Sequence, residues 1–583
     1  MIPANDIECH SLQHPIQNLK CFTLCPTMDL VSFPLDERVI LIYRRGNEKV
    51  WDVEPIDPEE NTDIKVQTLE WKPDGKMFTT VSGTGDLSLF DASTGKQLRK
   101  LHLSSSVKYL KWFQIHFDLS AQGKLANIVK SLDITSSLPF LAHDISIPPD
   151  ITLQNKSKNQ TLDFIITISG DQELCCIFRG IFVIDNIDLF TNGVSEVLEI
   201  IQCPDSSDFY CLSQKNEKTY LSALCTPMSN NDTKFTEILI VCSKLISIID
   251  QFNTFIKQIN AFQKPYIDYT VRIIELLRGE MKNELKTNST TENPNTGKIH
   301  DENNEAESQI NADPVYDLYD LLLTGSLSDS TKTWLTDFVS DRGMKRWTKL
   351  GNAYFDNAKS IAFSDIVTSL HHLIVLFTDL NALNALDPNI AYKINVDDCI
   401  EIATNYLKYT YKYMMKISEN QRSFEQTITW LSSILNEITN DEKTNPNIMV
   451  NEVTKYLTTL SEKLDGNSDN NDGLSLEEFT KSLSTNFDKL LIKIKSDIRS
   501  RFKVGNSVEL ESTKKCEIKI NKSSIAVMLD KSSAIPNLSR INLINMNQQR
   551  FDVKELQDVG IVDLLLLTET KLLVLFCDRI EQH

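Results

Sequence analysis

Residues 69–98 carry the pattern that most restricts how this chain can fold. Short segments of alternating apolar and polar residues are separated by turns rich in Pro, Gly and Asp, a pattern typical of antiparallel β-strands. Proline presets φ for a turn and glycine takes positive φ at little steric cost. The expected strands are 69–71, 77–81 and 87–89, and the expected turns are Pro73-Asp74-Gly75, 83–86 and 91–95. This succession predicts one blade of a β-propeller.

The same pattern recurs on both sides of this stretch. Shifted back by 47 positions, Pro73 falls on Pro26, so residues 24–50 form a second copy with diverged turns. Shifted forward by 41 positions, Leu69-Glu70-Trp71 falls on Leu110-Lys111-Trp112, which begins a third copy. A spacing of about 40 to 45 residues is typical of propeller blades.

The hydrophobic period changes near residue 250. Apolar residues then recur every three or four positions to about residue 502, which predicts long amphipathic helices packed in a bundle. Strand-like alternation returns over residues 505–583, with too few strands for a further domain. Because a propeller leaves unpaired edges until its ring closes, we expect these strands to complete the ring and the bundle to be inserted between blades.

The predicted fold class is therefore mixed β and α, a WD-repeat-like β-propeller of about seven blades with an inserted long α-helical bundle. The predicted domains are the N-terminal blades at 1–249, with strands as far as 235–249, the bundle at 250–504 and the closing strands at 505–583. Residues 288–313 are rich in Asn, Glu and Thr and hold almost no large apolar side chain. We expect a disordered acidic and polar linker there.

Charge and cysteine usage restrict the partners. A net charge of −20 argues against binding nucleic acid or anionic membranes through a general basic field. The first ten residues lack the basic and apolar regions of a secretory signal, and we expect no apolar run of bilayer-spanning length. The 12 scattered cysteines, several in apolar runs, favour buried free thiols in a reducing compartment.

Two segments resemble metal sites. His10, His14, Cys21 and Cys25 have zinc-binding residue types, but their order is unlike a zinc finger and Cys25 occupies the repeat position of Lys72. A blade strand explains these residues better than a metal site.

The second is residues 465–479, DGNSDNNDGLSLEEF, which resemble a calcium loop. Placing the invariant glycine at Gly473 puts Phe479 where a bidentate glutamate is needed. A helix start with Ser475 as N-cap and Glu478 at N3, a capping box, fits better. We therefore expect no metal, no cofactor and no small-molecule substrate.

Other chemistry-bearing side chains are better explained by packing. His371-His372 lie in an apolar helix without a metalloprotease glutamate, and Trp334, Trp347 and Trp430 lie on helices where burial is the usual fate of tryptophan. No nucleophile elbow or nucleotide-binding glycine loop is present, so we name no catalytic residue. Lys345 and Arg346 form a small basic cluster beside Trp347 that could meet an acidic partner, the alternative being a solvated helix face.

Several short sequence motifs, in order along the chain, resemble those of one family. They are Cys25-Pro26-Thr27-Met28-Asp29-Leu30, Val50-Trp51, Leu69-Glu70-Trp71-Lys72-Pro73-Asp74-Gly75-Lys76, Leu321-Leu322-Leu323-Thr324-Gly325, Trp334-Leu335, Gly343-Met344-Lys345-Arg346-Trp347 and Trp430-Leu431. The first three resemble the blades, and the rest the long helical domain, of the subunit 4 family of the anaphase-promoting complex. The resemblance covers both parts of the chain, although the connection at 119–160 and the linker at 288–313 have no obvious counterpart.

The resemblance implies a non-catalytic scaffold in the platform of a cullin–RING ubiquitin ligase that drives exit from mitosis. It implies neighbours in that complex, especially subunits 1 and 5, and a location in nucleus and cytoplasm. It gives structural roles to Cys25, Pro26, Asp29, Trp51, Trp71, Pro73, Asp74, Gly75, Gly325, Trp334, Gly343 and Trp347.

Two other hypotheses stay open. A free-standing propeller adaptor would bind peptide motifs on one face of the ring and would not need the bundle. A propeller-borne hydrolase would need His, Asp or Glu clustered in the central channel, and the nine histidines show no such grouping.

Overall fold

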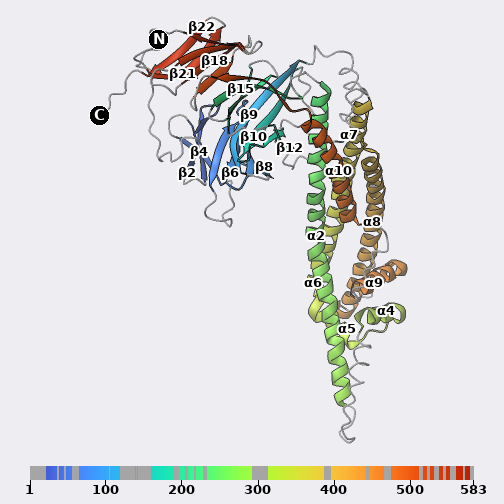
Figure 1. Ribbon diagram of the computed structural model, residues 1–583. Coiled ribbons are helices and arrows are strands. Elements are labelled where there is room, and N and C mark those ends of the chain that lie inside the picture. The colour runs from blue at the N-terminus through green and yellow to red at the C-terminus, as the bar shows by residue number, and fades with distance from the viewer. Residues whose placement is uncertain are drawn as a thin grey trace, which may run out of the picture.

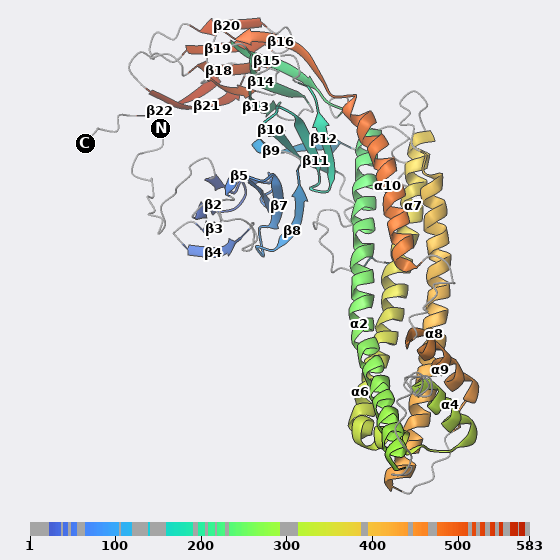
Figure 2. The same ribbon diagram turned by 60° about the horizontal axis from the view of Figure 1, so that its bottom comes forward.

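The computed structural model describes residues 22–35, 39–44, 48–54, 65–103, 106–118, 138–139, 141, 159–189, 196–203, 208–215, 218–227, 233–291, 313–385, 395–440, 447–464, 475–510, 516–520, 525–530, 537–542, 547–551, 560–568 and 571–577. Two parts are visible in Figure 1, a set of β-sheets and a long helical rod beside it. Figure 2 looks onto the sheets, which follow one another around a common centre as the blades of a propeller do.

The first three blades are built from consecutive strands. Each is a four-stranded antiparallel sheet in sequence order. Blade 1 holds β1 (Thr23–Leu24), β2 (Leu30–Leu35), β3 (Val39–Arg44) and β4 (Glu48–Val53), and blade 2 holds β5 (Val66–Trp71), β6 (Met77–Ser82), β7 (Asp86–Asp91) and β8 (Gln97–His102). Blade 3 holds β9 (Val107–Asp118), β10 (Asn159–Ser169), β11 (Leu174–Phe178) and β12 (Phe182–Ile187). The strands predicted within 69–98 and the copies around them are therefore present.

Blade 4 contains the entry and the exit of the helical part. Its strands are β13 (Glu196–Gln202), β14 (Phe209–Lys215), β15 (Lys218–Cys225) and β16 (Lys503–Leu510). Strand β16 pairs antiparallel with β15, from Thr219 opposite Leu510 to Cys225 opposite Lys503. The helical part is thus inserted within one blade, between its third and fourth strands, and the expected insertion between blades is corrected.

The remaining strands form two further sheets. One has four strands, β17 (Cys516–Ile520), β18 (Ile525–Asp530), β19 (Asn537–Asn542) and β20 (Asn547–Phe551), and the other pairs β21 (Gly560–Thr568) with β22 (Lys571–Cys577). Among the described residues, the strands of each of these sheets pair only within their own sheet, and none pairs with an N-terminal strand. The described residues therefore form six sheets, one fewer than the expected number of blades.

The helical part is an elongated bundle organised along one helix (Figure 1). Helix α2 (Thr233–Thr291) runs its length, and the segments packed along it are α4 (Pro314–Thr324), α5 (Asp329–Thr333), η5 (Trp334–Val339), α6 (Ser340–Ser360), η6 (Ile361–Val367), α7 (Thr368–Ala385), α8 (Asp397–Asn440), α9 (Val450–Leu464) and α10 (Leu476–Arg499). The segments η5 and η6 have π-helical hydrogen bonding.

The expected boundary at 249/250 is wrong, because α2 begins at Thr233. The residues predicted as a strand at 235–249 are helical, with Ile238, Cys242 and Leu245 buried one turn apart. A short apolar run does not distinguish a buried strand from a buried helix by its period. Helix α2 also continues through the exposed Pro265 to Thr291, and residues 292–312 of the expected linker lie outside the described residues.

One helical run in the described part, Asp329–Leu383, is long and apolar enough to cross a membrane, and 61% of its most apolar window is buried inside the protein. This qualifies the expectation of no such run. The buried fraction is what a core helix of a packed bundle shows, and Leu370, Leu373 and Phe377 of this run belong to the main core.

A single hydrophobic core crosses from blades 3 and 4 into the bundle. Phe178 of β11 and Phe235 of α2 meet edge to face at 6.1 Å. Around this core, Arg99 of β8 pairs with Asp250 of α2 at 2.8 Å, and Arg499 of α10 pairs with Asp185 of β12. The rod is therefore packed directly against the ring through a shared core and two ion pairs.

Candidate interaction surfaces and the contacts that support them

The segment that follows β1 in blade 1 contacts the turn that follows β5 in blade 2. The Cys25 thiol donates to the carbonyl oxygen of Gly75 at 3.8 Å, and the Thr27 hydroxyl donates to the carbonyl oxygen of Asp74 at 3.0 Å. Gly75 has φ of 73°, and a Cβ there would lie 2.8 Å from the Cys25 sulfur. Pro73 is half-buried in this turn, and Pro26 and Asp29 are exposed. The hydrogen bonds from Cys25 and Thr27 to the turn at Asp74 and Gly75 therefore join the two blades.

A tryptophan hydrogen bond repeats between successive blades. The Trp71 indole of blade 2 donates to the Ser32 hydroxyl of blade 1 at 2.8 Å. The Trp112 indole of blade 3 donates to the Thr79 hydroxyl of blade 2, also at 2.8 Å. The two tryptophans are equivalent in the sequence repeat, and so are Ser32 and Thr79. The repeat thus encodes the attachment of each blade to the one before it.

A buried ion pair joins blades 2 and 3. The Lys72 ammonium lies 2.9 Å from an oxygen of Asp74 and 2.9 Å from an oxygen of Asp163 on β10. The Lys72 side chain is 1% exposed and that of Asp163 is 9% exposed. Lys72 occupies the repeat position of Cys25, and each of the two residues reaches into the following blade.

Trp51 packs across the face of blade 2. Its ring stacks on Phe78 at 5.4 Å, and a Cβ at Gly95 would lie 3.1 Å from it. Its buried indole N–H has no hydrogen-bond partner in the described part of the chain. The ring therefore contributes by packing, and Gly95 permits its close approach.

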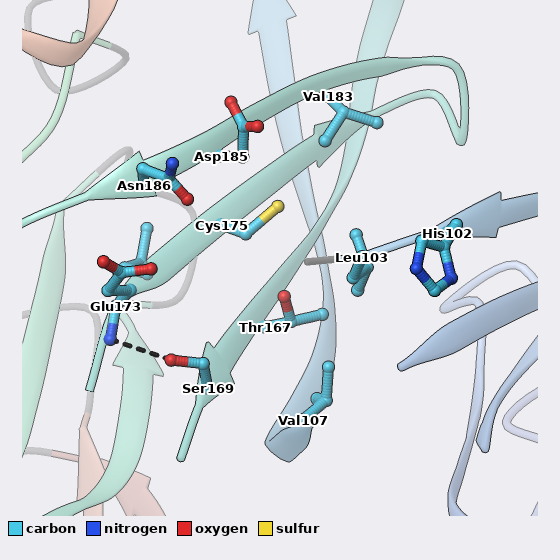
Figure 3. Close-up of a pocket in the computed structure, with 11 residues that line it drawn as sticks. His102, Leu103, Val107, Thr167, Ser169, Glu173, Cys175, Val183, Asp185 and Asn186 are labelled. Atoms are coloured by element: carbon cyan, nitrogen blue, oxygen red, sulfur yellow. Dashed lines mark hydrogen bonds between the residues drawn. The ribbon is translucent and has the colours of Figure 1, made fainter. Parts of the chain in front are cut away.

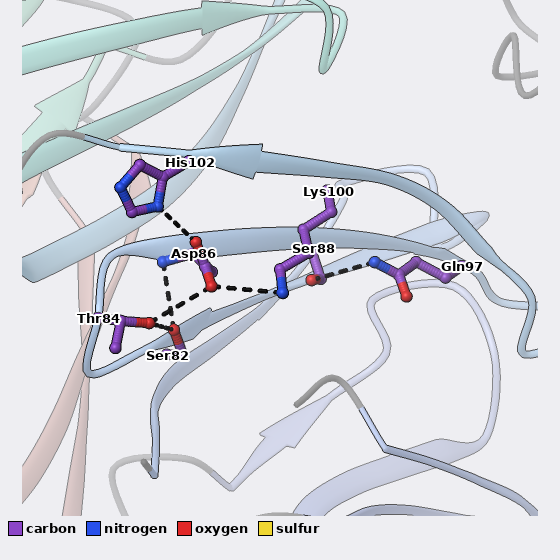
Figure 4. Close-up of polar contacts among 7 residues, drawn as sticks. All are labelled: Ser82, Thr84, Asp86, Ser88, Gln97, Lys100 and His102. Carbon is purple, nitrogen blue, oxygen red and sulfur yellow. Dashed lines mark hydrogen bonds and ion pairs between the residues drawn. The ribbon is translucent and has the colours of Figure 1, made fainter. Parts of the chain in front are cut away.

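Asp86 organises a polar network at the edge of blade 2 (Figure 4). One carboxylate oxygen lies 2.6 Å from Nδ1 of His102, and the other is 3.4 Å from the Lys100 ammonium and accepts from the Thr84 hydroxyl. Burial alone would raise the pKa of Asp86, but the hydrogen bond from His102 and the charge of Lys100 outweigh it and hold the pKa below its ordinary value. The network closes the β6–β7 turn onto β8.

A small pocket opens between blades 2 and 3 (Figure 3). Its volume is about 50 Å³, and Thr167, Glu173, Cys175 and Asp185 are among its lining residues. Burial raises the pKa of the Cys175 thiol to about 12, so the thiol stays protonated and is a poor nucleophile. The hydroxyl of Ser169 accepts from the backbone N–H groups of Asp171 and Glu173. These polar groups support the fold of a turn and a strand and are not aligned for nucleophilic attack.

Three charged residues lie on the first strands of blades 2, 3 and 4. Lys111 of β9 pairs with Glu199 of β13 at 3.3 Å, and it also lies near Glu70 of β5. Burial raises the pKa of Glu70 to about 7, although the charge of Lys111 lowers it in part. Glu70 is therefore the group in this row whose charge changes near neutral pH.

Replacing Glu70 by glutamine is expected to remove a pH dependence of stability. The folded-state pKa is raised above the ordinary value of 4.5, so ionising Glu70 costs stability as the pH rises from about 5 to about 8. We expect the melting temperature of Glu70→Gln to exceed that of the wild type at about pH 8, and the advantage to disappear at about pH 5. Thermal denaturation at both pH values, with exposed Glu48→Gln as the neutralising control, measures this. A constant difference at both pH values would contradict it.

In the bundle, two tryptophans from the short motifs named above hydrogen-bond to helix α2. The Trp334 indole donates to the carbonyl oxygen of Ile273 at 2.8 Å, and the Trp347 indole donates to the Thr270 hydroxyl at 2.9 Å. Both rings are at most 1% exposed. Gly325 ends α4 with φ of 70°, and its N–H donates to the carbonyl oxygen of Leu321. The expected packing roles of these residues agree with their positions.

The side chains of the motif at 343–347 lie on two different faces of α6. Met344 and Trp347 are buried, whereas Lys345 and Arg346 are exposed. At Gly343 the Tyr269 hydroxyl approaches so closely that a Cβ would lie 3.3 Å from it, and it donates to the Gly343 carbonyl oxygen at 3.2 Å. The exposed pair is thus held in place by the buried pair.

The suspected metal sites receive no support from the residues that the structure describes. Cys25 is engaged with Gly75, and residues 10, 14 and 21 lie outside the described part, as do 465–474. Ser475 and Glu478 form the predicted capping box. Nε2 of His372 lies 2.8 Å from the carbonyl oxygen of Pro139, and Trp430 is 6% exposed, so packing accounts for both. Among the described residues no group of three or more metal-ligating side chains is found.

Sequence reasoning missed three of these contacts. It did not identify Asp163 as the partner of Lys72, Thr79 as the partner of Trp112, or Tyr269 as the support of Gly343. The 47-residue shift that aligns Pro73 with Pro26 also aligns Thr79 with Ser32. Of the three contacts, the sequence repeat therefore indicated only the one between Trp112 and Thr79.

These features define a class of protein, a WD40-type β-propeller with a long helical domain inserted within one blade. Two family models match it. "Anaphase-promoting complex subunit 4 WD40 domain" matches residues 22–114, and "Anaphase-promoting complex, cyclosome, subunit 4" matches residues 221–441. Together they cover more than half of the chain, and the chain belongs to the anaphase-promoting complex subunit 4 family.

Relatives bearing that name match most of the chain. The chain is 20% identical to anaphase-promoting complex subunit 4 of Schizosaccharomyces pombe, over 75% of this chain and 59% of that protein. It is 19% identical to the mouse and human proteins of that name, over 71% of this chain and 50% of each relative. The matches thus span half to three fifths of the length of these relatives. The solved β-propeller domain of Cps50 (Swd1) from Myceliophteria thermophila is 8% identical over 37% of this chain and 53% of that one, but its TM-score of 0.22 is too low to argue from.

Proposed function

We propose that the protein is a non-catalytic scaffold subunit of the anaphase-promoting complex, a cullin–RING ubiquitin ligase of the cell cycle. Family membership supports its place in that complex. The observation that carries the scaffold role is the single hydrophobic core shared by ring and rod. A ring and a rod fixed at one angle can hold two neighbours in a set geometry, and permanent assemblies bury large surfaces of this kind.

The partners we propose are subunits of the same complex, especially subunits 1 and 5, with no direct nucleic-acid, membrane or small-molecule ligand. The proposed location is nucleus and cytoplasm. The absence of a catalytic role is likewise a proposal. It is supported by the polar groups of the pocket between blades 2 and 3, which are engaged in turns and strands, and by the high pKa of its thiol.

Affinity purification of the tagged full chain from its own cells tests this proposal. We expect the other subunits of the complex to be recovered in near-stoichiometric amounts, as quantified by mass spectrometry, because a platform subunit is a permanent component. An equal purification of the untagged strain controls for background. Recovery of the protein as a monomer would contradict the scaffold role. Recovery of proteins that share a short peptide motif, in place of the complex, would contradict it as well.

A further inference from the structure

A row of four cations lies on the exposed face of α6. Arg342, Lys345, Arg346 and Lys349 are all exposed, and their spacing of three, one and three residues places them on one side of a helix. Met344 and Trp347 occupy the opposite, buried face. We call these four residues the basic stripe.

The basic stripe is not neutralised by carboxylates in the part of the chain that the structure describes. None of its four residues forms an ion pair there, whereas two other lysines of the bundle pair along their own helices, Lys359 with Asp356 at 3.4 Å and Lys455 with Glu452 at 3.1 Å. Asp341 lies beside the first residue of the stripe and does not pair with it. Four neighbouring cations on one helical face repel one another, so an anionic partner would be stabilising.

The base of the stripe is preorganised. The Arg346 guanidinium lies 4.9 Å from the ring centre of Tyr269, a cation–π contact, and the same tyrosine donates to the carbonyl oxygen of Gly343. Trp347 fixes the helix to Thr270 from the buried side. Before the stripe, at the end of η5, Phe338 is 44% exposed, and its carbonyl oxygen lies 3.7 Å from the position that a Cβ of Gly343 would take. The cation–π contact therefore orders Arg346 before a ligand binds, which lowers the entropy cost of binding for that side chain.

We propose that the basic stripe and Phe338 bind an acidic segment of a partner polypeptide, with an apolar side chain of that segment against Phe338. A polypeptide fits better than nucleic acid or membrane, because the chain as a whole carries −20 and repels extended polyanions. The stripe is also short, about 10 Å at 1.5 Å per helical residue. The inference rests on the proposed scaffold role in that the partner is a neighbouring subunit of the complex.

Charge reversal of the stripe in the full chain tests the inference. The variant is Arg342→Glu, Lys345→Glu, Arg346→Glu and Lys349→Glu combined. Its control, with the same change in net charge, is Lys408→Glu, Lys412→Glu, Lys489→Glu and Lys493→Glu on the exposed faces of α8 and α10. We expect the stripe variant to recover at least one neighbouring subunit at least about fivefold less than the wild type, with the control unchanged, since like charges at an interface oppose association.

The outcomes separate the two proposals. If the wild type recovers no other subunit, the scaffold role fails. If the wild type recovers the complex and the stripe variant recovers it equally well, the scaffold role stands and the docking surface fails. Thermal melting of both variants checks that the bundle is folded.

A binding assay with defined probes tests the class of partner. The probes are a short synthetic peptide of glutamates with one leucine, a single-stranded DNA of the same length and vesicles containing phosphatidylserine. We expect the peptide to bind the wild type about tenfold more tightly than the stripe variant, more weakly as salt rises, and more weakly still to Phe338→Ala. Equal peptide binding by wild type and stripe variant, or preference for DNA or vesicles, would overturn the assignment.

Discussion

Replacing Trp71 by alanine is expected to lower the free energy of unfolding of the propeller by about 3–5 kcal/mol. The ring is 4% exposed, lies 5.4 Å from Phe78 and donates to the Ser32 hydroxyl. Alanine would remove the packing of blade 2 against blade 1 and leave a cavity that the rigid strands cannot fill. Chemical denaturation of the full chain, followed by circular dichroism in the β-sheet region, measures the loss.

A second substitution separates packing from hydrogen bonding. Trp71→Phe keeps most of the apolar volume but removes the indole N–H. The Ser32 hydroxyl would keep its contact with Thr23, so we expect a smaller loss, about 1–2 kcal/mol. Because Trp112 repeats the arrangement one blade on, Trp112→Ala should resemble Trp71→Ala. An unchanged denaturation midpoint for Trp71→Ala would show that this ring does not hold the blades together.

The blade pattern could be predicted from the sequence because its signals are local. Alternation gives the strands around Trp71, and Pro73 and Gly75 mark the turn, whose glycine has positive φ. Apolar residues that recur every three or four positions predicted the helices of the bundle in the same way. The capping box at Ser475 and Glu478 was predictable because its two residues are three positions apart.

The remaining features depend on contacts between distant segments. Strand β16 is mostly exposed, and one of its side-chain contacts with β15, from Tyr220 to Glu509, joins residues 289 positions apart. Its place in blade 4 cannot be read from local pattern. The start of α2 was missed because residues 235–249 are apolar enough for either kind of element.

The basic stripe shows the same division. Lys345 and Arg346 stand out as neighbours in the sequence, and helical spacing places Arg342 and Lys349 on the same side, but the exposure of that side follows only when the buried face of α6 is known. That face is set by Trp347 and Met344 packing on α2, together with the Tyr269 contact at Gly343, 74 residues from its partner. Tertiary packing, which a single sequence does not display, shows that the side of α6 with these four cations is the exposed one.

Removing the Lys72 ammonium is expected to be as damaging as removing Trp71. Lys72 lies between Asp74 and Asp163 at 2.9 Å from each, and one oxygen of Asp163 already has no partner in the described part of the chain. In Lys72→Met, the buried carboxylate of Asp163 would lose its counter-ion. Breaking a buried pair on one side costs about 3–5 kcal/mol, because the other charge stays buried and uncompensated.

The matched double variant distinguishes charge from shape. In Lys72→Met with Asp163→Leu both charges are gone and apolar groups of similar size replace them, a change that is often close to neutral. We therefore expect the double variant to recover most of the stability that Lys72→Met loses, measured by the same denaturation of the full chain. If the double variant is less stable than Lys72→Met, the pair itself stabilises the contact between blades 2 and 3. In that case Lys72 would hold the ring together by its charge, as Trp71 does by its packing.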